Sequence, residues 1–273
     1  MANDPRTYVL GNDPQELERL DRQAARIERP TRLLMQSAGI RPGMRVLDLG
    51  TGLGHVARIA GELVGPSGAV VGIDESGDAL AVARARTETA GARNVSFVEG
   101  DVRQWQAPEP FDAVVGRLIL FHLADPVAAV RHHRRHLRAG GTVVAVDFDI
   151  ASARSEPEVP LVSEALDWVM RAFEAAHAWP RIGARLGPIL TAAGLQNVVT
   201  MGMQAYLPPG ERAAAQLLGG VVRTLAPAIV KHGIASEAQI GLPTLEDRLH
   251  EALVRADAVL MPPTVVGAWG QSS

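Results

Sequence analysis

Three short segments with acids and glycines follow three apolar segments in the first half of the chain, and their spacing suits nucleotide chemistry. Residues 48–54 read Asp-Leu-Gly-Thr-Gly-Leu-Gly. Glycines in such a loop let backbone N–H groups approach a ligand, and the N-terminus of the following helix faces it. Asp74 comes 24 residues after Gly50, near the separation of about 20 at which an acid reaches a ribose hydroxyl in doubly wound folds. Asp101 closes the third segment. We therefore expect a nucleotide-like ligand at one edge of a sheet.

The loop favours a positively charged ligand over a dinucleotide. The dinucleotide fingerprint G-x-G-x-x-G requires glycine at position 55, where the chain has His55. A helix N-terminus attracts a pyrophosphate, but Asp48 beside the loop would repel one. For the loop taken alone, a tight structural turn is the alternative interpretation.

The segments that position these residues alternate between strands and helices. Strands are predicted at 44–49, 69–74, 95–98, 111–115 and 142–146, and helices at 14–38, 56–64, 76–91 and 126–137. Strands that are apolar throughout indicate a parallel sheet covered on both faces. The pattern loosens after residue 148. There we expect helices near 160–178, 183–193, 210–232 and 244–258, and strands near 197–206, 259–261 and 265–266.

Residues 44–148 resemble the class I S-adenosylmethionine-dependent methyltransferases, in the small-molecule branch related to ubiquinone and menaquinone biosynthesis. Four segments carry the resemblance, namely residues 46–54, Asp74, residues 100–102 and the turn at 137–141. It implies an α/β fold: a Rossmann-like, seven-stranded, mostly parallel sheet with helices on both faces and a helical lid. It also implies S-adenosyl-L-methionine as the cofactor.

For the methionine part of the cofactor, the resemblance implies that Gly50, Thr51 and Gly52 pack against it. Arg117 lies where relatives line the same side. Thr51 departs from the many relatives that carry Cys, but it is small enough to leave binding intact.

For the nucleoside part, the resemblance implies that Asp74 binds both ribose hydroxyls, with Glu75 beside it. Asp101 would accept a hydrogen bond from the adenine N6 amino group, in a segment that includes Val102.

Two residues are candidates for catalysis. His122 follows the fourth strand, and an imidazole with an ordinary pKa of about 6.5 suits a general base. Packing or orienting a loop is its alternative role. Asp147 and Asp149 flank Phe148 at the end of the fifth strand, and Asp147 could orient a substrate group or stabilise a carbocation. A structural role is equally open for both acids.

The sequence predicts no metal site. It has no cysteine, and residues 131–136 (Arg-His-His-Arg-Arg-His) have two histidines at i and i+4 without the Glu of H-E-x-x-H. We interpret this run as a solvated basic helix face. The single lysine, Lys231, follows no glycine-rich loop, so a P-loop is excluded.

The predicted domains are an N-terminal helical arm (1–40), a cofactor-binding core (41–150), core elements near 183–206 with helical lid insertions (151–258), and a closing edge strand with tail (259–273). Tyr8 in the arm would help to cover the cofactor. The insertion after the fifth strand carries apolar side chains that either pack or line the pocket: Trp168, Met170, Phe173 and Trp179.

Composition narrows the function classes. The chain has 273 residues and a net charge of −3, which argues against a duplex nucleic-acid partner, and its apolar runs are short of a bilayer span. We predict a cytoplasmic methyltransferase acting on O, N or C of a small molecule, with no nucleic-acid or membrane partner. The alternatives are an NAD-dependent oxidoreductase and a non-catalytic S-adenosylmethionine-binding or structural subunit. The acceptor and the oligomeric state stay open.

Overall fold

The computed structural model describes residues 14–273, with side chains from Asp21 onward except Gln23. Tyr8 lies outside the described residues. The chain divides into two compact units. Unit 1 comprises residues 1–147, 184–201 and 266–273, and unit 2 comprises residues 148–183 and 202–265.

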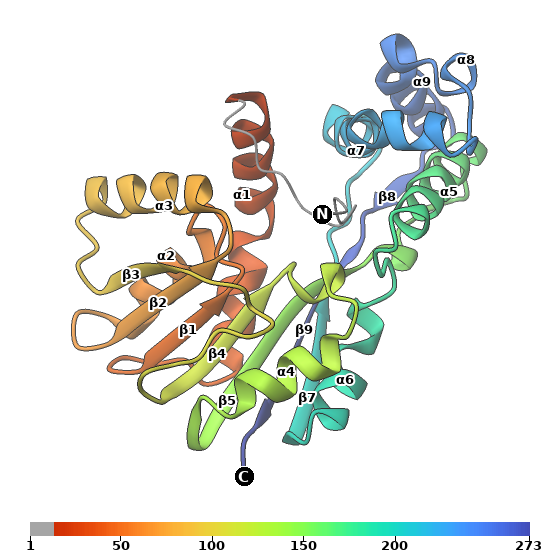
Figure 1. Cartoon of the computed structure of the whole chain (residues 1–273). Helices are drawn as coiled ribbons and strands as arrows, with labels where there is room; N and C mark the ends of the chain where they lie inside the picture. Colours follow the sequence, from red (N-terminus) through yellow and green to blue (C-terminus); the bar gives the residue numbers. More distant parts are fainter. Residues whose placement is uncertain (1–13) are drawn as a thin grey trace. The chain divides into compact units, whose positions relative to one another are not determined.

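A seven-stranded sheet has the order β3-β2-β1-β4-β5-β9-β7 (Figure 1). Its strands are β1 (Arg45–Leu49), β2 (Ala69–Asp74), β3 (Val95–Glu99), β4 (Phe111–Arg117), β5 (Leu137–Asp149), β7 (Gln196–Met203) and β9 (Thr264–Gln271). The registers from β3 through β5 are parallel. The apolar side chains of β1 and β4 are almost wholly buried, as continuous apolar runs predict. The predicted fold class, a seven-stranded mostly parallel sheet with helices, is confirmed.

The expectation that the last strand closes the edge of the sheet is wrong. The strand β9 lies between β5 and β7, and β7 holds the edge. Burial gives the reason: β9 is mostly buried, whereas most residues of β7 are exposed, including Val199 and Met201. A strand with a partner on only one side can present such a surface to water.

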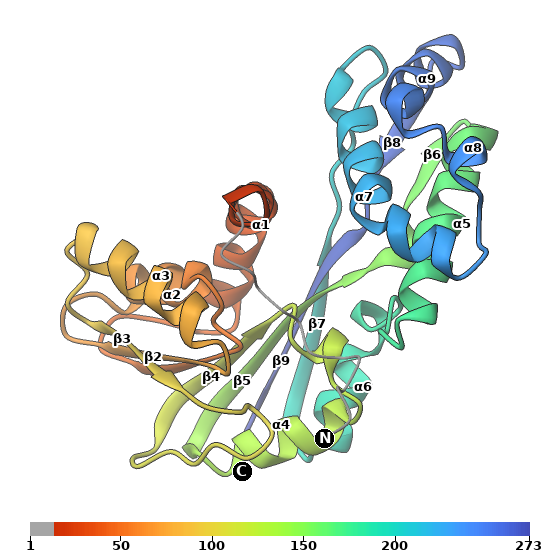
Figure 2. The ribbon, with the colours of Figure 1, turned by 45° about the horizontal axis from the view of Figure 1, so that its top comes forward.

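Helices cover both faces of the sheet in unit 1. Figure 2 shows α1 (Pro14–Ser37), α2 (His55–Val64) and α3 (Gly77–Thr89) on one face, with α4 (Pro126–Arg134) and α6 (Leu186–Ala192) on the other. Asp125 caps α4 by accepting a hydrogen bond from Ala128 N at 2.8 Å, and Pro126 occupies the first turn. The helix ends at Arg134, three residues earlier than predicted, because β5 already begins at Leu137.

The strand order places the ligand-binding edge. From β1 the chain proceeds outward to β2 and β3, then returns to β4 on the other side of β1. Ligands of open parallel sheets bind outside the carboxyl ends of the strands at such a reversal. The loop after β1 and the ends of β2, β3 and β4 therefore meet at one edge.

Unit 2 is mainly helical. Its helices are α5 (Pro160–Ala175), α7 (Arg212–Lys231), α8 (Glu237–Ile240) and α9 (Leu242–Arg255), and its strands β6 (Arg154–Glu156) and β8 (Val259–Met261) pair antiparallel. Short 3₁₀ helices cover Leu120–His122 (η1, in unit 1), Ile150–Ser152 (η2) and Gly183–Arg185 (η3). Trp168 is buried in the packing of α5, whereas Trp179 is 45% exposed.

The helix α7 is long and apolar enough to cross a membrane by length and composition, with a mean hydropathy of 1.5 in its most apolar window. Its buried residues pack against α5 and α9, and a core helix meets the same criterion. This helix is therefore weak evidence for a membrane span.

Candidate active site

The glycine loop after β1 has a backbone that only glycine adopts readily. Gly50, Gly52 and Gly54 have φ of +63°, +51° and +81°. A Cβ on Gly50 would lie 2.7 Å from Cδ1 of Ile119, so this turn has no room for a side chain. A Cβ on Gly52 would meet no atom of the described chain within 4 Å. The backbone at Gly52 is thus open to close approach by a ligand.

Asp74, at the end of β2, is held by this loop. One carboxylate oxygen accepts from Gly52 N at 2.8 Å and the other from Ser76 N at 3.0 Å. Each oxygen has a second lone pair, so the carboxylate can accept two further hydroxyls. Glu75 beside it is exposed. The structure therefore brings Asp74 and the glycine loop together, as predicted.

Asp101, just past β3, is engaged by Arg103, which no sequence motif marked as part of the site. Arg103 Nη2 lies 2.7 Å from Asp101 Oδ2, and the Arg103 backbone N donates to Oδ1 at 2.8 Å. The hydrogen bonds from Arg103 lower the pKa of Asp101. The Asp101 carboxylate is therefore ionised, which suits an acceptor of a hydrogen bond from an amino group. An adenine amino group would have to compete for it with the exposed guanidinium of Arg103.

Asp48 is an acid buried at the base of the site. Its side chain is 1% exposed and accepts from Thr51 Oγ1 at 2.6 Å. The other oxygen, Oδ1, has no hydrogen-bond partner among the described residues. Burial raises the pKa of Asp48 to about 7. A buried carboxylate with an unused acceptor suits a cationic group of a ligand.

Arg117 supplies the opposite charge at the end of β4. Burial lowers its pKa to about 10, against the favourable charges of Asp48 and Glu28. Its Nη1 donates to Thr31 Oγ1 at 3.2 Å, which ties β4 to α1. The next residue, Leu118, has φ of +55°, a conformation that branched apolar residues rarely adopt and that concentrates at functional sites.

His122 is the last residue of η1, and the Asp147 carboxylate accepts a backbone hydrogen bond from this turn. Asp147 is 2% exposed and accepts from the backbone N of Phe121 at 3.2 Å. The ring of His122 is exposed and stands edge-on to Phe121, with centroids 5.0 Å apart. Partial desolvation lowers the pKa of His122, so the ring is neutral at pH 7. The buried position of Asp147 fits a positioning role, and direct contact with substrate stays a prediction. Asp149 belongs to unit 2.

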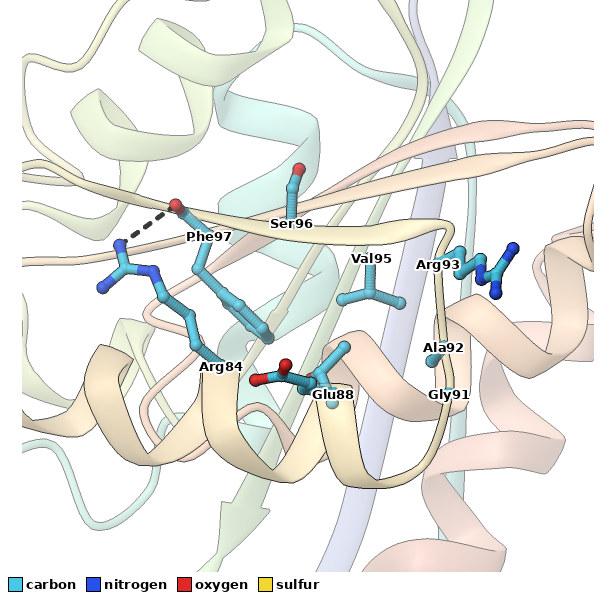
Figure 3. A pocket seen from close by; sticks show the side chains of 9 residues that line it. Arg84, Glu88, Gly91, Ala92, Arg93, Val95, Ser96 and Phe97 are labelled. Atoms are coloured by element: carbon cyan, nitrogen blue, oxygen red, sulfur yellow. Dashed lines mark hydrogen bonds between the residues drawn. The ribbon is translucent and has the colours of Figure 1, made fainter.

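A surface hollow of 590 Å³ lies elsewhere, between α3 and the edge strand β3 (Figure 3). Arg84 on α3 donates to the carbonyl oxygen of Phe97 at 3.2 Å across it. None of the predicted site residues lines this hollow. It marks an exposed sheet edge that Arg84 partly covers, not the predicted cofactor site.

The interpretation of residues 131–136 as a solvated face is wrong for two histidines. His133 is fully buried and His136 is 7% exposed. Both pack under the segment that follows Asp101, because His133 Nε2 donates to Val102 O at 2.6 Å. A short polar run shows no apolar periodicity that could reveal such a buried side.

Comparison with known families agrees with this geometry. A model described as "Methyltransferase domain" matches residues 40–194, more than half of the chain. The chain belongs to the methyltransferase domain family. The matched segment contains every predicted site residue, from Gly50 to Asp147. The NAD-dependent alternative gains no support.

Curated relatives of this chain include ubiquinone/menaquinone biosynthesis C-methyltransferases UbiE. The protein of Ectopseudomonas mendocina is 34% identical over 138 residues, which cover 50% of this chain and 52% of the relative. That of Pseudomonas fluorescens is 34% identical over 144 residues, 52% of this chain and 54% of the relative. The chain spans about half the length of these relatives.

Solved structures share the fold of this chain. The YcgJ protein from Bacillus subtilis has a TM-score of 0.58 at 20% identity, covering 90% of this chain and 98% of its own. Phosphoethanolamine N-methyltransferase 2 of Haemonchus contortus, in complex with S-adenosyl-L-methionine, has a TM-score of 0.56 at 18% identity, covering 90% and 52%. The [4+2]-cyclase SpnF has a TM-score of 0.52 at 19% identity, covering 90% and 82%. The fold thus hosts more than one reaction, and function has to be argued from the site.

Proposed function

We propose that this protein binds S-adenosyl-L-methionine and transfers its methyl group to a small-molecule acceptor. The observation that carries the proposal is the joining of the glycine loop to Asp74 by the hydrogen bond from Gly52 N, beside open backbone at Gly52. A ribose bound by Asp74 would lie next to that open backbone. Membership in the methyltransferase domain family and the similarity to the UbiE relatives support the same reaction.

Charges at the site support the methionine end of this cofactor. Its ammonium and sulfonium groups are cationic and its carboxylate is anionic. Asp48 offers a buried negative charge and Arg117 a half-buried positive charge, and Gly50, Thr51 and Gly52 would pack against the methionine part. Asp74, with Glu75 beside it, would take the ribose, and Asp101 and Val102 the adenine.

The acceptor end of the reaction is assigned to His122. Methyl transfer proceeds in line from sulfur to the acceptor atom, and orientation supplies much of the rate. A neutral imidazole can remove the proton that a hydroxyl, an amine or an activated carbon loses. Asp147 would position it through Phe121. The names of the UbiE relatives favour carbon as the acceptor atom.

The remaining parts of the proposal are the cytoplasmic location, the absence of nucleic-acid and membrane partners, and the division into a core at 41–150 with flanking lid segments.

Two experiments test the proposal. Calorimetry should show adenosylhomocysteine binding more tightly than NAD, and the reverse order would refute the cofactor assignment. Incubation of the protein with a metabolite extract and methyl-labelled S-adenosylmethionine should yield, by mass spectrometry, a product that is one labelled methyl heavier. Binding without any labelled product would instead support the non-catalytic alternative.

A further inference from the structure

Three histidines converge where α4 ends and the chain turns into β5. One ring nitrogen from each of His132, His133 and His136 lies within 4.8 Å of those of the other two. The ring centroids are 4.9 to 5.2 Å apart. We call these three residues the histidine cluster. None of them takes part in the proposed methyl transfer.

The outer ring nitrogens of the histidine cluster all face oxygen atoms of the segment after β3. Nε2 of His132 is 2.8 Å from Trp105 O, and Nε2 of His133 is 2.6 Å from Val102 O. Nε2 of His136 is 3.3 Å from Gln106 Oε1. A proton on each Nε2 satisfies all three oxygens, and a neutral ring protonated there leaves Nδ1 as a bare lone pair.

This arrangement leaves two lone pairs face to face. Nδ1 of His133 and Nδ1 of His136 are 3.2 Å apart. Two bare acceptors at that distance repel unless a proton or a cation lies between them. Ligand nitrogens at about 2.0–2.1 Å from a tetrahedral metal ion lie about 3.3–3.4 Å from each other. The observed separation is therefore close to that of two ligands on one ion.

We propose that the histidine cluster binds a divalent transition-metal ion such as Zn²⁺ through Nδ1 of His133, Nδ1 of His136 and a ring nitrogen of His132. Imidazole is a preferred ligand of zinc, nickel and copper. Metal-bound histidines usually donate their other N–H to a carbonyl or carboxylate oxygen, and here each Nε2 has such an acceptor. A metal ion here would depart from the expectation of no metal site, which rested on the i and i+4 spacing of two histidines without the Glu of H-E-x-x-H.

The surroundings of the histidine cluster suit a cation. The last turn of α4 presents the negative end of the helix dipole. The guanidinium of Arg134 is engaged by Gly194 O, whereas Arg135 opposes positive charge near His136.

The ion would have a structural effect on the cofactor site. It would fix the three rings that bond to the segment 102–106, which follows Asp101. The inference itself is independent of the proposed methyl transfer, because metal binding is measured without cofactor.

The test uses the untagged full chain after removal of metals with a chelator. Titration with Co²⁺, read by its visible absorption, and with Zn²⁺, read by calorimetry, should show one ion per chain with a Kd of about 10 μM or tighter. His132→Asn alters the half-buried member of the cluster and is the variant most able to fold. It should weaken binding by tenfold or more, in line with the tenfold to hundredfold losses seen even for outer-shell changes at metal sites.

His232→Asn is the matched control, because it removes an exposed histidine outside the histidine cluster. It should bind both ions as the wild type does, and circular dichroism should show that both variants are folded. No saturable binding below about 100 μM in the wild type would overturn the proposal. Equal binding by His132→Asn would overturn it as well. In that case His133 and His136 would be joined by a hydrogen bond in which Nδ1–H of His136 donates to Nδ1 of His133. Nε2 of His136 would then be an acceptor, and the side-chain amide of Gln106 would turn its NH₂ group toward it.

Discussion

Replacing Asp48 by Asn should stabilise the cofactor-free protein at neutral and alkaline pH. In the folded chain, burial raises the pKa of Asp48 to about 7, whereas an unfolded chain has the ordinary value of 3.8. The folded state therefore binds the proton more tightly, and ionisation of Asp48 lowers the free energy of unfolding as pH rises from about 4 to about 7. Above pH 7 the full cost remains.

The magnitude follows from the separation of the two pKa values. They differ by about three pH units, and one unit corresponds to about 1.36 kcal/mol, so the full cost is about 4 kcal/mol. Asn has no such titration. Compared with the wild type, Asp48→Asn should gain about 3 kcal/mol of unfolding free energy between pH 5 and pH 8. A new buried N–H in the variant adds only an offset that does not change with pH.

The assay is urea unfolding of both proteins at several pH values, followed by circular dichroism. The difference between the two curves removes the contribution of the other titrating groups. Thr51→Val is an independent check, because its loss of a hydroxyl donor should raise the pKa of Asp48 further and shift the inflection to higher pH. A stability difference that is constant from pH 5 to pH 8 would refute the raised pKa. Asp48→Asn should also bind S-adenosylmethionine and adenosylhomocysteine more weakly, and by a similar factor, because both ligands carry the ammonium group that would face Asp48.

Three further predictions concern the site. Asp74→Ala should weaken adenosylhomocysteine binding at least tenfold, since two charge-assisted hydrogen bonds of about 1.5–3 kcal/mol each are lost, and calorimetry within twofold of wild type would exclude Asp74 as the ribose ligand. Arg103→Ala should strengthen adenosylhomocysteine binding by up to about fivefold, because adenine must displace the exposed Arg103–Asp101 ion pair, which is worth no more than about 1 kcal/mol. Weaker binding by this variant would instead make Arg103 part of the cofactor site. His122→Ala should lower kcat by about 10²–10⁴-fold with cofactor affinity unchanged. Because the pKa of His122 is lowered, the wild-type rate should fall on acidification only below about pH 6.5, and a variant with less than tenfold loss and the same pH profile would remove this base.

Local sequence patterns were sufficient to predict the strands of the sheet and the edge at which the candidate site residues lie. Apolar runs mark the strands, and glycines and acids mark where β1, β2 and β3 end. The order of strands β9 and β7 beyond β5 could not be predicted in this way. The position of β9 inside the sheet depends on pairing with strands distant in sequence, which no local pattern reports.

The same limit applies to the partners of the site residues. Thr31 meets Arg117 across 86 positions of sequence, and only the packing of α1 against the core brings them together. The burial of His133 is likewise set by a loop about 30 residues earlier. The pairing of Arg103 with Asp101 spans two residues and could have been found from the sequence, because an Asp in a loop commonly accepts a hydrogen bond from the backbone N–H two positions later.

A buried acid and a half-buried arginine interrupt two neighbouring strands that are otherwise apolar. β1 and β4 are neighbours, and Asp48 and Arg117 occupy their carboxyl ends, where an apolar side chain would pack at no electrostatic cost. Neither charge is fully compensated by the protein: Asp48 Oδ1 has no partner among the described residues, and burial lowers the pKa of Arg117 in spite of the nearby acids. Proteins retain such costs mainly where function requires them. A zwitterionic amino-acid end, with its ammonium toward Asp48 and its carboxylate toward Arg117, compensates both at once, and this is the physical argument that the cofactor binds with its methionine part between β1 and β4.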